Sequence, residues 1–178
     1  MCNSIFNFTK IYFMKMLLII RHAKSSWANI GEEDFDRDLN DRGKKDAPEM
    51  AKRLVDKKIS IDAFISSPAK RAKKTCKAFC NVFSADQDKI IFIDSLYHAA
   101  IETFYEVIKN LDNDYKTVAI FSHNPIITDF VNTLCKDFKI DNMPTCAVFG
   151  VRIDIKTWKD FKNAEKKFLL FDYPKATN

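Results

Sequence analysis

Short apolar runs alternate with helical patterns along most of the chain, and this alternation constrains the fold more than any other feature. Four runs have the length and composition of strands buried on both faces: 17–20, 62–65, 89–93 and 117–121. Apolar residues then recur with helical spacing at 47–55, 69–83, 104–111 and 126–135. The alternation predicts an α/β fold, with a mainly parallel sheet and helices on both of its faces.

The last forty residues follow a different pattern. Phe149, Val151, Ile153 and Ile155 alternate with polar neighbours, and a second apolar run follows at 168–173. Period-two alternation of this kind predicts an antiparallel hairpin at a sheet edge. Pro48 lies inside the first helical pattern, so either that helix kinks or its regular part begins only near Asp46.

The chain has 178 residues, enough for one domain with a substantial core. We expect a single domain over 14–178, preceded by an extension at 1–13 that is either unpaired or the product of an upstream start codon. Lys10 and Lys15 interrupt the apolar residues of this segment, which argues against a signal peptide or a membrane span. The expected location is cytoplasmic.

The cysteine pattern and the net charge limit which metals and macromolecules the protein is expected to bind. The five Cys are odd in number and match no zinc spacing, so they are interpreted as reduced thiols; a metal or redox pair at Cys76 and Cys80 is the alternative. The net charge of +5 is spread along the chain, which is typical of a solvated basic surface. We expect neither nucleic acid nor a membrane as partner.

Polar residues gather where three predicted strands end. The first strand ends in Arg21 and His22, the second leads into "SSPAKRAKKT" (66–75), and the fourth leads into "SHNP" (122–125). Ligands of open α/β sheets bind beyond the carboxyl ends of the strands, so these residues are expected to meet. Ser-Pro at 67–68 and Asn-Pro at 124–125 each predict a helix N-cap followed by Pro, with backbone N–H groups facing outward. Such helix ends bind anions.

The basic residues of the second predicted helix have two interpretations. Lys70, Arg71, Lys73 and Lys74 crowd its first turns, where the helix dipole disfavours positive charge. Either an anion compensates part of this charge or the lysines form a solvated face. Arg71 is nearest the helix start and can reach the predicted edge. The chain has three Gly and no glycine-rich phosphate loop, so a phosphate would be held by side chains and helix ends.

The three His residues could serve a metal, a structural hydrogen bond or catalysis. His22, His98 and His123 lack the close spacings of zinc sites, and two of them adjoin cationic or capping residues. Their positions beside Arg at strand ends favour a functional interpretation for His22 and His123.

The motifs "RHAKSSW", "DFDRDLNDRG", "SSPAKRAKKT", "LYHA" and "SHNP" resemble the histidine phosphatase superfamily, and among its members the SixA-type phosphohistidine phosphatases. The resemblance implies a three-layer α/β/α sandwich of the phosphoglycerate mutase type, with no cofactor and no metal. It also implies that His22 is a transiently phosphorylated nucleophile, that Arg21 and Arg71 bind phosphate, and that His123 is the second pocket histidine.

The chain departs from the mutases of this superfamily at two positions. Their proton-donating Glu aligns with His98, and their Asn near position 28 is Ala28. We expect a phosphatase that acts on phosphohistidine of a protein, with His98 and Ser25 as further substrate contacts and Trp27 at the entrance. A small-molecule phosphomonoesterase and a phosphate-binding module without turnover are the alternatives. Four further residues are expected to serve as loop and helix-start scaffolding: Asp36, Arg37, Asp41 and Arg42. For Arg37 the alternative is a side chain that faces the pocket.

Overall fold

The computed structural model describes residues 13–27 and 31–176. The predicted extension at 1–13 therefore lies outside the described residues except for Phe13, as does Ala28. Within the described part of the chain, six strands form one sheet in the order β3-β2-β4-β1-β5-β6. The strand bounds are β1 Met14–Arg21, β2 Ala63–Ser66, β3 Ile91–Phe92, β4 Thr117–Ser122, β5 Val148–Asp154 and β6 Lys166–Asp172.

Strands β1 to β4 are parallel to one another, whereas β5 pairs antiparallel with β1, and β6 pairs antiparallel with β5. The predicted α/β fold, including the antiparallel hairpin at the sheet edge, is confirmed. The predicted run at 89–93 contributes less strand than expected, because only Ile91 and Phe92 pair with β2. Gln87–Lys89 forms a short 3-10 helix instead.

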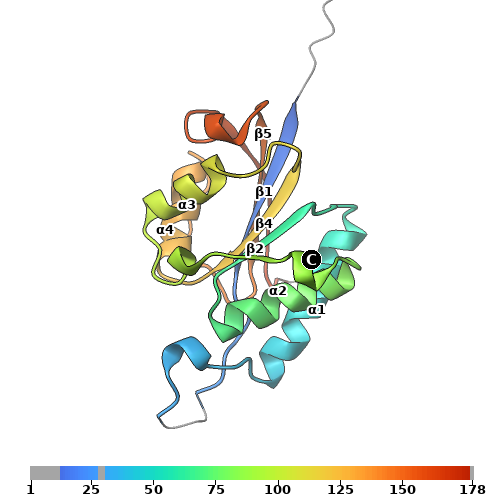
Figure 1. Ribbon diagram of the computed structural model, residues 1–178, viewed down its shortest axis with the longest axis vertical. Helices are drawn as coiled ribbons and strands as arrows, with labels where there is room; N and C mark the ends of the chain where they lie inside the picture. The colour runs from blue at the N-terminus through green and yellow to red at the C-terminus, as the bar shows by residue number, and fades with distance from the viewer. Residues whose placement is uncertain (1–12, 28–30, 177–178) are drawn as a thin grey trace, which may run out of the picture.

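Four α-helices cover the two faces of the sheet. Their bounds are α1 Asp41–Asp56, α2 Lys70–Val82, α3 Ile101–Lys109 and α4 Ile126–Leu134. Helices α1 and α2 lie on one face, and α3 and α4 lie on the other (Figure 1). None of the helices among the described residues is long and apolar enough to span a membrane.

Strand β1 lies in the middle of the sheet and supplies both halves of the core. Leu17 and Ile19 belong to the apolar cluster under α3 and α4, whereas Leu18 and Ile20 belong to the cluster under α1 and α2. All four side chains are fully buried, and each contributes roughly 1.5–3 kcal/mol of hydrophobic free energy. Burial on both faces explains why this strand is a continuous apolar run.

Some expectations about helix starts are wrong. The regular part of helix α1 begins at Asp41 rather than near Asp46 and runs through Pro48, and the Asn40 side chain caps it by accepting a hydrogen bond from the Gly43 N–H at 2.9 Å. The predicted caps of the other two helices are also displaced: α2 follows Ala69 and α4 follows Pro125, neither with a side-chain cap. The cause is competition, since Ser67 and Asn124 hydrogen-bond to other side chains.

Candidate active site

Two histidines lie side by side because two neighbouring parallel strands end in register. Arg21, at the end of β1, pairs with Ser122, at the end of β4. The next residue of each chain segment is a histidine, so the ring centroids of His22 and His123 are 5.1 Å apart. Both side chains are buried. The strand-end argument from the sequence therefore places these two imidazoles correctly.

Arg71 completes this group from the first turn of α2. Its Nε donates a hydrogen bond to His22 Nε2 at 3.3 Å. Helix α2 follows β2, whose Ser66 pairs with Phe121 of β4, so the helix start stands at the same sheet edge as the histidines. The guanidinium is nearly as buried as the imidazoles, with 7% of its side chain exposed.

The hydrogen bonds of His22 determine which ring nitrogen carries the proton. Its Nδ1 lies 2.8 Å from the carbonyl oxygen of Ala23, which can only accept a hydrogen bond, so Nδ1 carries the hydrogen. Nε2 then has a free electron pair, toward which Arg71 Nε–H points. Burial lowers the pKa of His22 to about 3, and the positive charge of Arg71 acts in the same direction. The ring is therefore neutral at physiological pH.

The surroundings of His123 do not favour a positive charge on its ring. Burial lowers the pKa of His123 to about 2, with His22 and Arg71 adding to the effect. Its Nε2 shares a hydrogen bond of 2.8 Å with Ser67 Oγ. Its Nδ1 is a buried atom that has no hydrogen-bond partner among the described residues. A protonated His123 beside a neutral His22 would therefore need a bound anion to compensate the added positive charge.

Arg21 contributes a second guanidinium to the same edge. Its Nη1 donates to the carbonyl oxygen of Met143 at 2.6 Å, while its Nε is buried without a partner among the described residues. Burial lowers the pKa of Arg21, and the nearby Arg71 lowers it further. The main chain is also held here: Arg21 N–H donates to Ala147 O, and Cys146 N–H donates to His22 O, both at 3.1 Å.

Asp34 supplies negative charge to this group. Its carboxylate Oδ2 accepts hydrogen bonds from Arg71 Nη2 and from the Tyr97 hydroxyl, both at 2.8 Å, and Oδ1 accepts from Arg37 at 2.6 Å. Partial burial would raise the pKa of Asp34, but the hydrogen bonds from Tyr97 and Arg71 outweigh it and lower the pKa to about 2. Asp34 is therefore ionised at neutral pH.

Comparison with known proteins agrees with this arrangement. A model of the histidine phosphatase superfamily (branch 1) matches residues 17–91, which include His22 and Arg71. Over residues 17–91 the chain is therefore similar to the histidine phosphatase superfamily. It is 36% identical over 86 residues to phosphoserine phosphatase 1 of Hydrogenobacter thermophilus. That match covers 46% of this chain and spans 40% of the length of the relative.

Two solved structures resemble most of the chain. A protein described as phosphohistidine phosphatase SixA, from Agrobacterium tumefaciens, is 25% identical and has a TM-score of 0.73 over 90% of this chain and 98% of its own. The protein histidine phosphatase SixA complexed with tungstate is 20% identical, with a TM-score of 0.75 over 89% of this chain and 97% of its own. The likeness at 20% identity concerns the fold alone.

Two candidates from the sequence do not join the group of His22, Arg21, Arg71 and His123. His98 is exposed and its ring contacts Tyr97, with centroids 4.1 Å apart. Ser25 is buried, and its Oγ accepts a hydrogen bond of 2.6 Å from Arg37. Neither residue has a contact with the two histidines among those the structure describes.

Three lysines in the first turns of α2 contact other side chains of the same protein, and two of them are compensated by a carboxylate. Lys74 forms an ion pair with Asp38 at 2.5 Å, and Lys70 lies 3.8 Å from the same carboxylate. Lys73 lies over the Phe92 ring. Acidic residues of the segment before α1 thus balance the basic start of α2.

The sequence interpretation missed three residues that contact the candidate site. Asp34 and Thr75 hydrogen-bond to Arg71, and Tyr97 hydrogen-bonds to Asp34. Asp34 and Tyr97 occur in the motifs "DFDRDLNDRG" and "LYHA", but neither had an assigned role. The sequence shows several acidic residues before Arg37. Nothing in their order indicates that one of them, Asp34, hydrogen-bonds to Arg71.

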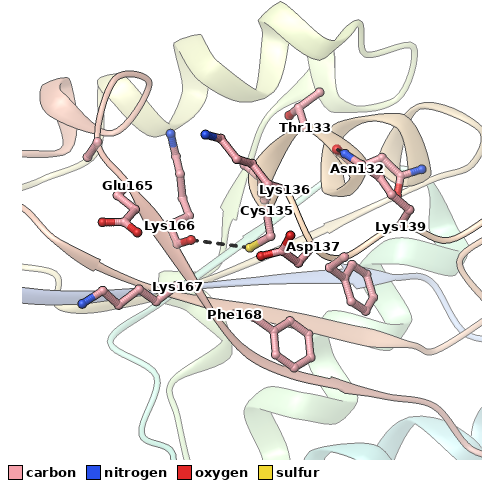
Figure 2. Close-up of a pocket in the computed structure, with 13 residues that line it drawn as sticks. Asn132, Thr133, Cys135, Lys136, Asp137, Lys139, Glu165, Lys166, Lys167 and Phe168 are labelled. Carbon is pink, nitrogen blue, oxygen red and sulfur yellow. Dashed lines mark hydrogen bonds between the residues drawn. The ribbon is translucent and has the colours of Figure 1, made fainter.

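A cavity lies elsewhere in the molecule, away from the two histidines. It has a volume of about 820 Å³ and lies between the chain after α4 and strand β6, with Lys136, Lys166 and Phe168 among its lining residues (Figure 2). Lys166 pairs with Ile153, which pairs with Lys15 near the start of β1. The cavity therefore lies toward the opposite end of β1 from His22.

Proposed function

We propose that this protein is a metal-independent histidine phosphatase that removes the phosphoryl group from phosphohistidine on a protein through a phosphorylated His22. The observation that carries the proposal is the neutral His22 ring, whose unprotonated Nε2 accepts a hydrogen bond from Arg71 Nε–H. A nucleophile of this kind needs an unprotonated nitrogen, and a phosphoryl group needs adjacent positive charge. Arg71 would exchange its hydrogen bond to Nε2 for one to a phosphoryl oxygen before the attack.

In the first step, the Nε2 electron pair of His22 attacks phosphorus in line with the leaving group. The bond from phosphorus to the leaving nitrogen breaks, and its electron pair stays on that nitrogen. Arg21, Arg71 and His123 bind the equatorial phosphoryl oxygens, where negative charge accumulates in the transition state. The two guanidinium groups supply positive charge that a metal ion provides in other phosphatases.

In the second step, a water molecule attacks the phosphorus of phosphorylated His22. The bond between phosphorus and Nε2 breaks, inorganic phosphate leaves, and the neutral ring is restored. The Ala23 carbonyl keeps the Nδ1 hydrogen in place through both steps, so the same tautomer is ready for the next substrate.

The preference for phosphohistidine follows from the leaving group. An alkoxide needs a proton donor, which commonly contributes about 10²- to 10⁴-fold to the rate. Asp34 is the carboxyl group bonded to Arg71, and its low pKa leaves it without a proton to give at neutral pH. An imidazole that is already protonated leaves as a neutral ring and needs no such donor.

Hydrolysis of small phosphomonoesters is the second candidate function. The 36% identity to a phosphoserine phosphatase over 86 residues favours it. Its distinguishing property would be a higher kcat/KM with phosphoserine than with a phosphohistidine protein.

The test is phosphate release from a phosphohistidine protein, from phosphoserine and from p-nitrophenyl phosphate. We expect the wild type to prefer phosphohistidine, His22→Ala to lose at least 10³-fold in kcat, and a ³²P-phosphoryl group to label the wild type alone. His98→Ala is the matched control, since it removes an exposed imidazole outside the group. Full activity of His22→Ala would overturn the proposed nucleophile.

A further inference from the structure

Every nitrogen of the Arg71 guanidinium already faces a protein acceptor. Nε donates to His22 Nε2, Nη2 donates to the Asp34 carboxylate, and Nη1 donates to the backbone carbonyl oxygen of Asp34. The edge formed by the two terminal nitrogens is the one that binds oxyanions with two parallel hydrogen bonds. Asp34 occupies this edge with both its main chain and its side chain.

A phosphoryl group that bound Arg71 would therefore lie close to the Asp34 carboxylate. His22 Nε2 accepts from Nε and Asp34 Oδ2 accepts from Nη2 of the same guanidinium, so a phosphoryl group that binds Arg71 while bonding to His22 Nε2 would lie near the carboxylate. The Tyr97 hydroxyl and Arg37 hold the carboxylate in this position. A fixed negative charge here repels a dianion and attracts a cation.

We propose that Asp34 is a specificity-determining residue: it competes with the phosphoryl group for Arg71 and selects substrates whose leaving group carries positive charge. This inference rests on the proposed function and deepens it. A phosphomonoester is a dianion with a neutral leaving group and gains nothing from Asp34. N-phosphohistidine protonated on its second ring nitrogen carries a cation directly on the leaving group, which the carboxylate attracts.

The charge of Asp34 can be removed with little change of shape. In Asp34→Asn we expect inorganic phosphate and tungstate to bind about fivefold more tightly, as measured by isothermal titration calorimetry. We also expect kcat/KM for p-nitrophenyl phosphate to rise about fivefold, while kcat/KM for a phosphohistidine protein does not rise. Both differences from the wild type should shrink as ionic strength increases.

Two further variants separate charge from structure. Asp36→Asn removes the same charge from the same exposed 3-10 turn and should behave like the wild type. Tyr97→Phe removes one of the hydrogen bonds that hold the Asp34 carboxylate, so it should change phosphate affinity and substrate preference in the same direction as Asp34→Asn, by a smaller factor. This variant also tests the idea if Asp34→Asn fails to fold, since a change in the opposite direction would contradict the role of Asp34.

The outcomes distinguish this inference from the proposed function. If the wild type neither binds phosphate nor releases it from any substrate, the proposed function fails. If the wild type turns over phosphohistidine but Asp34→Asn has unchanged phosphate affinity and unchanged preference, the role of Asp34 fails and the proposed function stands.

Discussion

Thr75 joins the two parts of the candidate site through one hydroxyl group. The Ala23 N–H donates to Thr75 Oγ1 at 2.9 Å, and this hydroxyl donates to the Arg71 carbonyl oxygen at 2.7 Å. Thr75 is fully buried. The turn that follows His22 is thereby attached to the helix that carries Arg71.

Replacing Thr75 with Val should destabilise the protein by about 1–3 kcal/mol, because the buried Ala23 N–H loses its acceptor while the side-chain volume is nearly kept. Urea denaturation measures this change. Thr75→Ser keeps the hydroxyl and should be clearly more stable than Thr75→Val. Equal stability of the two variants would show that the hydrogen bond is not what matters.

The buried histidines make stability depend on pH. An unfolded His titrates near 6.5, whereas the folded pKa values are about 3 for His22 and about 2 for His123. In the range between, the unfolded chain binds more protons than the folded chain, so the free energy of unfolding falls as pH decreases below about 6.5. Each His should account for a loss of about 1–2 kcal/mol between pH 7 and pH 5.

His123→Asn should flatten this pH dependence by removing one of the two groups. Urea denaturation at pH 7, 6 and 5 lies above the range in which the Asp34 carboxylate titrates, and a group such as Asp46, whose pKa burial raises, is present in both chains. The difference between the two profiles therefore reports His123. A variant that loses as much stability as the wild type over this range would contradict the neutral, buried state of His123.

At the scale of elements, helix α1 lies against the segment that follows β1. An added Cβ at Gly43 would lie 2.2 Å from the Lys24 carbonyl oxygen, a backbone atom that cannot rotate away. Gly43→Ala should therefore destabilise the protein by more than about 2 kcal/mol, although Ala favours helices over Gly by about 1 kcal/mol. Thermal unfolding checks this, with the exposed Lys44→Ala as control. A gain of stability in Gly43→Ala would mean that the helix moves away easily.

The elements that could be predicted from the sequence are those whose residues are buried in a regular pattern. Leu17 to Ile20 are apolar because β1 is covered on both faces, so the strand and its position in a parallel sheet follow. The two histidines follow as well, since they come directly after such strands. The 3-10 turn at Asp34–Asp36 has no buried residue and no period, so nothing local indicates that Asp34 contacts Arg71. The predictions of helix caps were wrong for a related reason. Ser67 hydrogen-bonds to His123, 56 residues away, and no local pattern indicates that contact.

At the scale of the whole molecule, two apolar clusters share one sheet. Both include residues of β1, β2, β4 and β5. Neither cluster can be exposed without disturbing the strands that support the other. We therefore propose that the described residues form a single cooperative domain, as expected for 14–178.

This proposal predicts one unfolding transition. Far-UV circular dichroism and the fluorescence of the buried Trp158 should give the same midpoint in urea, because helices and core unfold together. Midpoints that differ beyond experimental error would indicate two separately folding parts.

The backbone bonds from Ala147 and Cys146 to the Arg21-His22 segment also concern the order of synthesis. The proposed nucleophile is made early, near the start of the chain, but the residues that fix its main chain are made more than 120 positions later. During translation the main chain at His22 can therefore reach its final geometry only after the residues that directly precede β5 have been made. A ribosome-bound chain stalled before residue 143 would carry every residue of the His22, Arg21, Arg71 and His123 group and still lack the shape that makes them a site.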